Sequence, residues 1–270
     1  MIVGMIGGEG KMGRLLAPIL KRHVDDVLTS LDPVEIAKKS DVIIFTVPME
    51  VTVEVIEKLL PHIKESHLLM DFTSVKEGPC RAMLRSPASV IGLHPLFGPT
   101  VSSLEGQTVV LCPERAGKWK RWISEILEKE GASVVEMTPR DHDETMATVQ
   151  SLVHFCSLLF IETIRLNQKD PKKLAKMATP VYKMQLNIAG RIANQSSELY
   201  RSIQFENPYF LPLLEFFEKG FKTLRDIVEK KDREGFDRFF KNCHDFLGKE
   251  ILDEGQKTTD AFIEMMKRKL

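Results

Sequence analysis

The sequence of 270 residues has no excess of charge of either sign, because 38 Lys and Arg balance 38 Asp and Glu. Nucleic acids and acidic membrane surfaces attract proteins with a basic surface, so this balance gives no reason to expect either as a partner. Any attraction of an anionic substrate must therefore come from local charges in a site.

The sequence also lacks paired cysteines and long apolar runs. Its cysteines, at positions 80, 112, 156 and 243, are far apart and form no CxxC pair, which argues against a zinc site and a dense disulfide framework. The apolar run 42–45 is stopped by Pro48, far too short to cross a bilayer. A strand that begins at Ile2 leaves no room for a signal peptide. We therefore expect a cytoplasmic protein with free thiols, no metal and no membrane partner.

Two halves of the chain differ in their periodicity, and the length itself suggests two domains. In the first half, short apolar runs alternate with amphipathic stretches, which predicts an α/β Rossmann domain with a doubly wound parallel sheet over residues 1–138. After Thr138 we find almost no strand pattern. The stretch 141–166 predicts one long helix, and its middle is apolar nearly all round. We expect an all-helical domain over residues 139–270 that dimerises through this helix.

A glycine motif follows the first predicted strand and opens the first predicted helix. It reads Gly8-Glu9-Gly10-Lys11-Met12-Gly13, a GxGxxG pattern in the context of a dinucleotide-binding fingerprint. The first glycine permits a tight turn, the second lets backbone approach a pyrophosphate, and the third lets helix and strand pack closely. The helix N-terminus then presents N–H groups to the phosphates. The predicted cofactor-binding residues of this loop are Gly8, Gly10, Lys11, Met12 and Gly13.

The acid that binds the ribose hydroxyls in such a site usually lies about 20 residues beyond the glycines. Asp26 and Asp32 are the candidates. Asp32 fits best, although it could equally cap the helix that follows it. No arginine occurs between Arg22 and Arg81 to receive a 2′-phosphate. NAD is therefore favoured as cofactor, and NADP is not excluded.

Polar residues follow two later strands of the predicted sheet. Ser74 and Lys76 come after the strand 68–72, and His94 comes after the strand 89–93. Ligands of doubly wound sheets bind in the crevice outside the carboxyl ends of the strands, so these three residues should point toward the same ligand-binding crevice. Val47 and Pro48, at the end of the strand 41–47, complete the predicted cofactor site at this edge.

The order of these motifs resembles that of prephenate dehydrogenases. The segments GGEGKMGR, DFTSVKE, GLHPLFGP, PRDHDETMATVQSLVHF and VYKMQLNIAGRIANQSSELY occur in the family's order, over nearly the whole chain to about residue 250. The stretch 23–35 is shorter than in the family, which affects only the assignment of the ribose-binding acid.

The resemblance implies oxidation of prephenate to 4-hydroxyphenylpyruvate, with loss of carbon dioxide and hydride transfer to NAD, a step of tyrosine biosynthesis. His94 matches the family's catalytic histidine, which accepts a proton, and Ser74 matches a serine that hydrogen-bonds near the same hydroxyl. Arg191 matches the arginine that binds a substrate carboxylate. The further residues that match the substrate pocket are His142, Lys76, Lys183 and Gln195. The resemblance also implies a homodimer and a possible feedback ligand, tyrosine, linked in the family to the position of His154.

Other functions stay open. Arogenate dehydrogenase has the same chemistry, with an amine in place of the side-chain ketone. A dehydrogenase of the 3-hydroxy acid type would have a lysine in an early helix of the second domain, where this sequence has His142, Gln150 and His154. A regulatory protein that senses NAD without turnover is disfavoured, because His94 and Arg191 both stand at family positions. The chain could also be one section of a larger polypeptide with other enzymes of aromatic biosynthesis.

Overall fold

The computed structural model describes residues 1–29 and 32–267, which divide into two compact units. Unit one comprises Met1–Cys156 and Ala193–Phe210, and unit two comprises Ser157–Ile192 and Leu211–Leu270. The predicted boundary at residues 138 and 139 follows the change in periodicity. The compact unit extends beyond it, because the first turns of the helical half pack against the sheet.

Unit one contains a seven-stranded sheet in the order β2-β1-β3-β4-β5-β6-β7. Its neighbouring strands are parallel except for β5 and β6, which are antiparallel, so the predicted parallel sheet is a mostly parallel one. The connection between β5 and β6 contains no helix, whereas the crossover between two parallel strands usually contains one. The strands are β1 (Ile2–Ile6), β2 (Asp26–Leu28), β3 (Val42–Phe45), β4 (Leu68–Asp71), β5 (Ser89–Pro95), β6 (Thr108–Arg115) and β7 (Ser133–Glu136).

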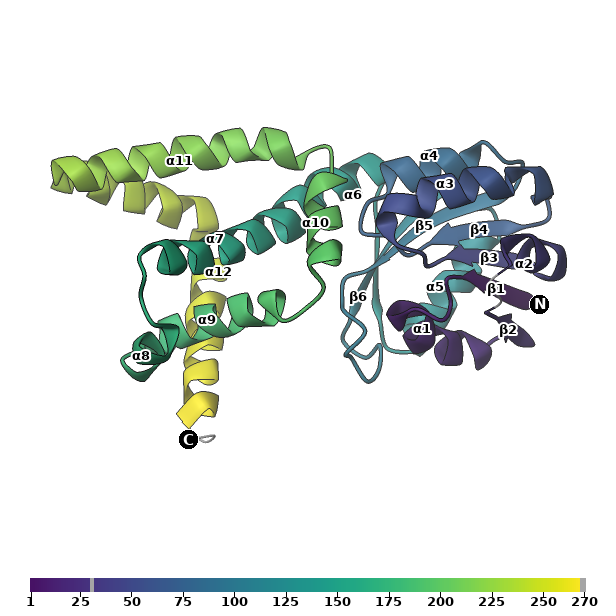
Figure 1. Cartoon of the computed structure of the whole chain (residues 1–270), viewed down its shortest axis with the longest axis horizontal. Coiled ribbons are helices and arrows are strands. Elements are labelled where there is room, and N and C mark those ends of the chain that lie inside the picture. Colours follow the sequence, from purple (N-terminus) through teal and green to yellow (C-terminus); the bar gives the residue numbers. More distant parts are fainter. Residues whose placement is uncertain (30–31, 268–270) are drawn as a thin grey trace. The chain divides into compact units, whose positions relative to one another are not determined.

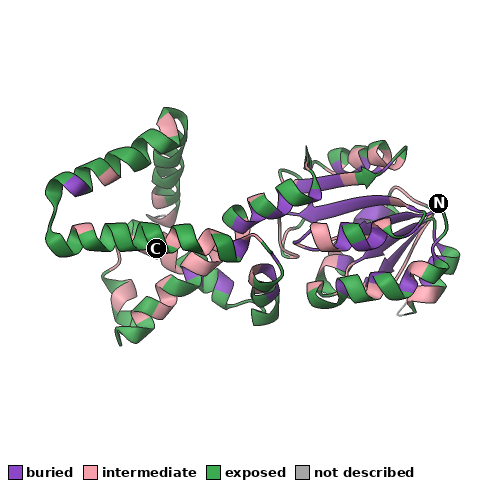
Figure 2. Ribbon diagram, turned by 90° about the horizontal axis from the view of Figure 1, so that it is seen from above, coloured by how far each residue is buried: buried purple, intermediate pink, exposed green. Residues whose placement is uncertain are grey.

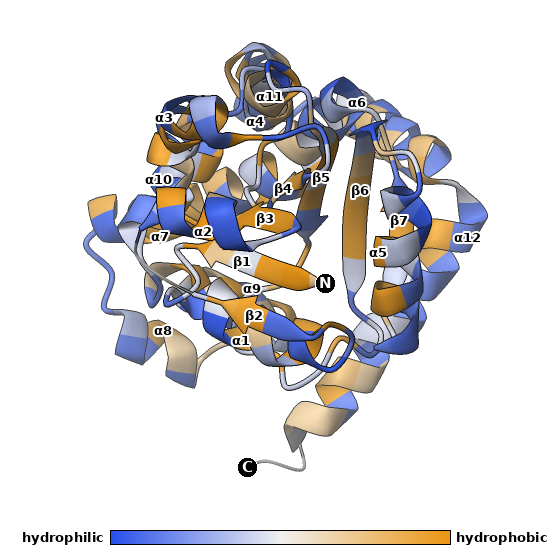
Figure 3. Cartoon of the chain, turned by 90° about the vertical axis from the view of Figure 1, so that its right-hand side faces the viewer, coloured by the Kyte–Doolittle hydropathy of each residue, from blue (hydrophilic) through white to orange (hydrophobic). Residues whose placement is uncertain are grey.

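Helices cover both faces of this sheet, as Figure 1 shows for unit one. The apolar side chains of α1 and α5 pack on one face, and those of α2, α3 and α4 pack on the other. The central strands β1, β3, β4 and β5 are therefore buried on both faces, and they are largely apolar rather than alternating (Figure 3), whereas the edge strand β7 is mostly exposed. The helices are α1 (Lys11–Lys21), α2 (Pro33–Lys39), α3 (Met49–Leu59), the 3₁₀ turn η1 (Leu60–His62), α4 (Glu77–Leu84) and α5 (Trp119–Lys129).

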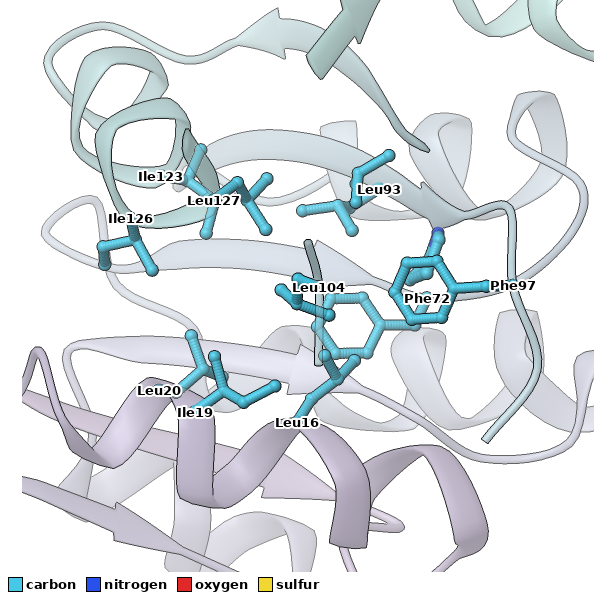
Figure 4. A pocket seen from close by; sticks show the side chains of 12 residues that line it. Leu16, Ile19, Leu20, Phe72, Leu93, Phe97, Leu104, Ile123, Ile126 and Leu127 are labelled. Carbon is cyan, nitrogen blue, oxygen red and sulfur yellow. The ribbon is translucent and has the colours of Figure 1, made fainter. Parts of the chain in front are cut away.

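A small cavity of about 20 Å³ lies between α1, α5 and the sheet (Figure 4). Its volume corresponds to about one water molecule, but its walls are apolar, so it offers no polar partners to water or to a ligand. We interpret it as a packing void rather than a binding site. The lining residues are Leu16, Ile19, Leu20, Phe72, Leu93, Pro95, Phe97, Leu104, Val109, Ile123, Ile126 and Leu127.

The long helix expected over residues 141–166 forms with one irregularity. It consists of α6 (Pro139–Met146), the π-helical segment η2 (Ala147–Leu152) and α7 (Val153–Leu166). The stretch Pro139–Leu166 is long and apolar enough to cross a membrane by length and composition alone. However, α6 belongs to unit one, where His142 and Asp143 are buried, and a single helix of this kind is weak evidence for a membrane span.

Unit two consists of the later turns of α7 with further helices, and much of its surface is exposed (Figure 2). The short helices α8 and α10 lacked a clear apolar period in the sequence. The last helix, α12 (Arg233–Lys267), has a break at Gly248, where φ is +72°, and residues 268–270 lie outside the described residues. The remaining helices are α8 (Pro171–Lys176), α9 (Pro180–Ala193), α10 (Ser197–Phe205), α11 (Phe210–Lys230) and α12 (Arg233–Lys267), of which α10 belongs to unit one.

Candidate functional site

The glycine loop directly follows β1. At this point the order of the strands changes sides, because β2 lies on one side of β1 and β3 lies on the other. The strand β1 pairs with β2 on one side and with β3 on the other, which defines the switch point where doubly wound sheets bind ligands. Gly7 adopts φ +82°, and a Cβ there would lie 2.9 Å from Cγ1 of Val47. The ends of β1 and β3 therefore meet at the predicted cofactor loop, with Pro48 directly before α3.

The N-terminus of α1 is suited to bind an anion. Gly10 stands at the N-cap position, and no side chain among the described residues caps this helix. The N–H groups of its first turn, at Lys11, Met12 and Gly13, are thus available to the phosphates of a dinucleotide. A Cβ at Gly13 would lie 2.2 Å from the carbonyl oxygen of Gly8, so only glycine permits this close turn. These features fit a nicotinamide dinucleotide.

A buried ion pair lies just beyond β4. Lys76 has no exposed surface, and its ammonium group pairs with Asp71 and donates to the carbonyl oxygen of Leu93 at 3.0 Å. Asp71 also accepts from the backbone N–H of Thr73 at 3.0 Å. A buried ammonium group needs such partners, because an unpaired buried charge is strongly destabilising. Lys76, expected on the wall of the substrate pocket, is placed inside the fold, where it supports the strand that holds His94.

His94 belongs to a chain of buried hydrogen bonds. Its Nδ1 lies 2.8 Å from Nε2 of His142, and Nδ1 of His142 lies 2.7 Å from Oδ1 of Asp143. The carboxylate of Asp143 also accepts from the backbone N–H groups of Lys76 and Glu77, at 2.7 and 2.9 Å, at the start of α4. The main-chain oxygen of Asp143 accepts from Nδ2 of Asn207 at 2.8 Å, which ties α10 and its following loop to this centre.

These contacts allow one consistent arrangement of protons on the neutral histidines. A carboxylate only accepts, so Nδ1 of His142 is the donor to Asp143 and Nε2 of His142 is an acceptor. Nδ1 of His94 must then donate to it, which leaves the lone pair of His94 on Nε2. The arrangement makes Nε2 of His94 a base, oriented by His142 and Asp143. Asp143 and Asn207 are not among the residues expected from the sequence, although the adjacent pair His142-Asp143 is visible in it.

Burial keeps these histidines neutral. Desolvation, with contributions from His142 and Lys76, holds the pKa of His94 well below its ordinary value of 6.5. Burial also lowers the pKa of His142, although the hydrogen bond to Asp143 opposes the shift. Burial alone lowers the pKa of His154 to about 4. A neutral His94 can accept a proton over a wide range of pH.

These lowered pKa values predict that the folded state loses stability in mild acid. The unfolded chain binds protons at its histidines near pH 6.5, whereas folded His94, His142 and His154 resist protonation. The free energy of unfolding should therefore be unaffected by these groups above about pH 6.5. It should fall below that pH, by up to about 1.4 kcal/mol per pH unit for each histidine. Urea midpoints measured between about pH 7.5 and 5 would test this. A midpoint that stays constant over that range would contradict it.

The remaining predicted site residues lie in several elements. Ser74 is half-buried in the loop between β4 and α4, at the same edge of the sheet as the glycine loop. Arg191 is exposed near the end of α9, Lys183 is half-buried in the same helix, and Gln195 is exposed before α10. No ion pair of Arg191 occurs among residues 1–29 and 32–267, which leaves its guanidinium available to an anion.

Comparison with known proteins gives two family matches. The model of the prephenate dehydrogenase nucleotide-binding domain matches residues 20–136, and that of the prephenate dehydrogenase dimerization domain matches residues 138–242. A "probable arogenate/prephenate dehydrogenase" of Methanocaldococcus jannaschii is 35% identical over 275 residues, 93% of this chain and 62% of that protein. The "T-protein" of Haemophilus influenzae is 33% identical over 253 residues, 90% of this chain and 66% of that protein. The matched part of the chain thus spans slightly less than two thirds of the length of each of these two relatives.

A solved structure has the same fold. The crystal structure of prephenate dehydrogenase from A. aeolicus, in complex with hydroxyphenyl propionate and NAD⁺, superposes with a TM-score of 0.69 at 22% identity. The match covers 90% of this chain and 96% of that one. The agreement supports the expected combination of a Rossmann domain with a helical domain.

Proposed function

Since the chain belongs to the prephenate dehydrogenase family, we propose that it oxidises prephenate to 4-hydroxyphenylpyruvate with release of carbon dioxide and with NAD as hydride acceptor. The observation that best supports this function is the oriented, neutral His94 at the edge of the sheet that bears the glycine loop. Such an imidazole supplies the base that oxidation of a hydroxyl group requires.

Each part of the site has a role in this reaction. The glycine loop and the N-terminus of α1 would hold the pyrophosphate of the dinucleotide, and Val47 and Pro48, at the end of β3, would complete the cofactor site. The bound nicotinamide supplies a hydride acceptor. Nε2 of His94 accepts the proton of the substrate's C4 hydroxyl, and Nδ1 stays hydrogen-bonded to His142, which spreads the new positive charge toward the carboxylate of Asp143. Ser74 hydrogen-bonds near the same hydroxyl.

The substrate's carboxylates need cations, although the chain has no net charge. Arg191 is the proposed ligand of one carboxylate, because a guanidinium holds a carboxylate with two parallel hydrogen bonds. Lys183 and Gln195 are weaker candidates for the same pocket. Arogenate is the second candidate substrate, since the M. jannaschii relative is named a probable arogenate/prephenate dehydrogenase. Tyrosine as a feedback ligand and a cytoplasmic location stay predictions.

The decisive experiment follows the absorbance of reduced cofactor with the purified chain. Prephenate and arogenate are each offered with NAD or NADP, and kcat/KM is compared among the four pairs. We expect the highest value with prephenate and NAD. A higher value with arogenate would transfer the proposal to that substrate. Absence of turnover with every pair, while NAD still binds, would favour a sensing protein or a different dehydrogenase.

We also propose that the chain forms a homodimer through its helical half. The exposed apolar side chains of unit two include Phe216, Phe240 and Phe246, which are 72%, 65% and 89% exposed. Leu158 and Leu159 of α7 are exposed as well. Apolar surface of this extent on a single chain is typical of an obligate interface. A second copy of the chain is the partner that the match to a dimerization domain supports.

This proposal predicts a mass of twice 30.7 kDa by light scattering at micromolar concentration. Leu159→Glu on α7 should shift the protein toward the monomer, because an interface does not accommodate a desolvated, unpaired carboxylate. Val51→Glu on α3 is the matched control, since Val51 is 38% exposed and Leu159 is 39% exposed. A monomeric parent protein, or equal effects of both substitutions, would contradict the proposal.

A further inference from the structure

Asp26 and Asp32, the two candidate acids for binding the cofactor's ribose, have positions and hydrogen-bond partners that do not favour contact with the ribose. Asp26 lies opposite Ile2 in the pairing of β2 with β1, so it is at the end of the strands away from the glycine loop. There its Oδ1 accepts a hydrogen bond of 2.7 Å from Nζ of Lys21. Asp32 is the N-cap of α2, and its Oδ1 accepts from the backbone N–H groups of Val34 and Glu35, at 2.9 and 3.3 Å. Ser30 and Leu31, between these acids, lie outside the described residues.

A different carboxylate lies at the end of β2, and it comes from the glycine loop itself. Oε1 of Glu9 accepts a hydrogen bond of 2.8 Å from Oγ1 of Thr29, the residue directly after β2. Loop and strand end are in tight contact, because a Cβ at Gly8 would lie 2.8 Å from Cγ2 of Thr29. In Rossmann domains the end of the second strand is where the adenosine ribose is bound.

The carboxylate of Glu9 also has a cation beside it. Oε2 of Glu9 lies 3.6 Å from Nη2 of Arg14 on the first turns of α1, and both side chains are more than half exposed. An arginine at this place is a potential ligand for a 2′-phosphate, and Arg14 precedes the stretch between Arg22 and Arg81 that lacks arginine. In the parent protein its charge is offset by Glu9.

We propose that Glu9 selects NAD over NADP by binding the ribose hydroxyls, and that Glu9 keeps Arg14 from serving a 2′-phosphate. The carboxylate accepts hydrogen bonds from the ribose hydroxyls of NAD and repels the 2′-phosphate of NADP. Thr29 orients it from the end of β2. The short stretch around β2 thus needs no acid of its own. This inference rests on the proposed cofactor binding, and it names the residue that sets the preference.

Titration calorimetry with NAD and with NADP tests this directly, without turnover. Glu9→Gln keeps the shape of the side chain and removes its charge. We expect a Kd for NADP lower by about tenfold or more and a higher Kd for NAD, the size of change that repulsion between nearby charges supports. Adding Arg14→Ala to Glu9→Gln should abolish the gain in NADP affinity, because the freed guanidinium is then absent.

Two single variants serve as controls. Glu35→Gln removes the same charge from an exposed glutamate of α2 that pairs with Lys39, and it should leave both Kd values unchanged. Asp32→Asn tests the acid expected from the sequence, and it should leave the ratio of the two Kd values unchanged. The inference is overturned if the parent binds NAD and Glu9→Gln keeps that ratio, or if Asp32→Asn shifts it instead. A parent protein that binds neither cofactor would refute the proposed function itself.

Discussion

Replacement of His94 by asparagine is expected to lower kcat by about 10²–10⁴-fold, the usual contribution of a positioned general base. Asparagine suits the test because its Nδ2 lies where Nδ1 of the imidazole lies, so it still donates to Nε2 of His142. The buried pair His142-Asp143 then keeps its hydrogen bonds, and the base at Nε2 is lost. Fold, stability and the Kd of NAD should change little. Alanine would be a poorer choice, since an unsatisfied buried acceptor costs about 1–3 kcal/mol.

The matched control is His67→Asn, in a buried histidine away from the site. Nδ1 of His67 accepts from the backbone N–H of Lys64 at 3.1 Å, and Oδ1 of asparagine can take its place. Its kcat should equal that of the parent. In the parent, kcat/KM should stay high in mild acid and fall only well below pH 6.5, because burial lowers the pKa of His94. Near-normal turnover of His94→Asn, or an acid limb at pH 6.5 or above, would exclude His94 as the base.

Replacement of Arg191 by alanine should raise KM for prephenate by about 10- to 100-fold, the loss expected for hydrogen bonds between charged groups. The Kd of NAD should stay nearly unchanged. Arg191→Lys should rescue only partly, since the charge remains and the bidentate geometry is lost. Gly190, the residue before Arg191, is exposed, and nothing in the described chain lies within 4 Å of the place of a Cβ there, so Arg191 stands on an open helix surface.

Arg165→Ala is the control for a lost surface arginine. Arg165 is exposed on α7, also in unit two, and pairs with Glu162 of its own helix at 2.6 Å. An exposed pair of this kind contributes little to stability, so neither KM nor kcat should change. Initial rates over a range of prephenate concentrations give both constants, and calorimetry gives the Kd of NAD. If Arg191→Ala keeps the parent's KM, Arg191 does not contact the substrate, and its place near the end of α9 reflects only the helix dipole.

Most of the fold could be predicted because its signals are local. Buried parallel strands are short apolar runs, and β1, β3, β4 and β5 were all recognised within a residue or two of their ends. The change from strand to helix patterns near Thr138 was equally visible. The short helices α8 and α10 were missed because a helix of six to nine residues shows barely two turns of its period. The antiparallel direction of β6 was missed because an apolar run has no direction.

The site was predictable in part, for a similar reason. Motif order placed Ser74, His94 and the glycine loop at one edge of the sheet, because the carboxyl ends of parallel strands meet there. The sequence by itself thus determined the family, the two kinds of domain and the residues of the loop. Only the tertiary structure decided the partners: Asp71 for Lys76, Asp143 for His142 and Thr29 for Glu9. Hydrogen bonds and ion pairs act over about 3 Å between side chains, and a linear pattern contains no information on such distances until the strands and helices are packed.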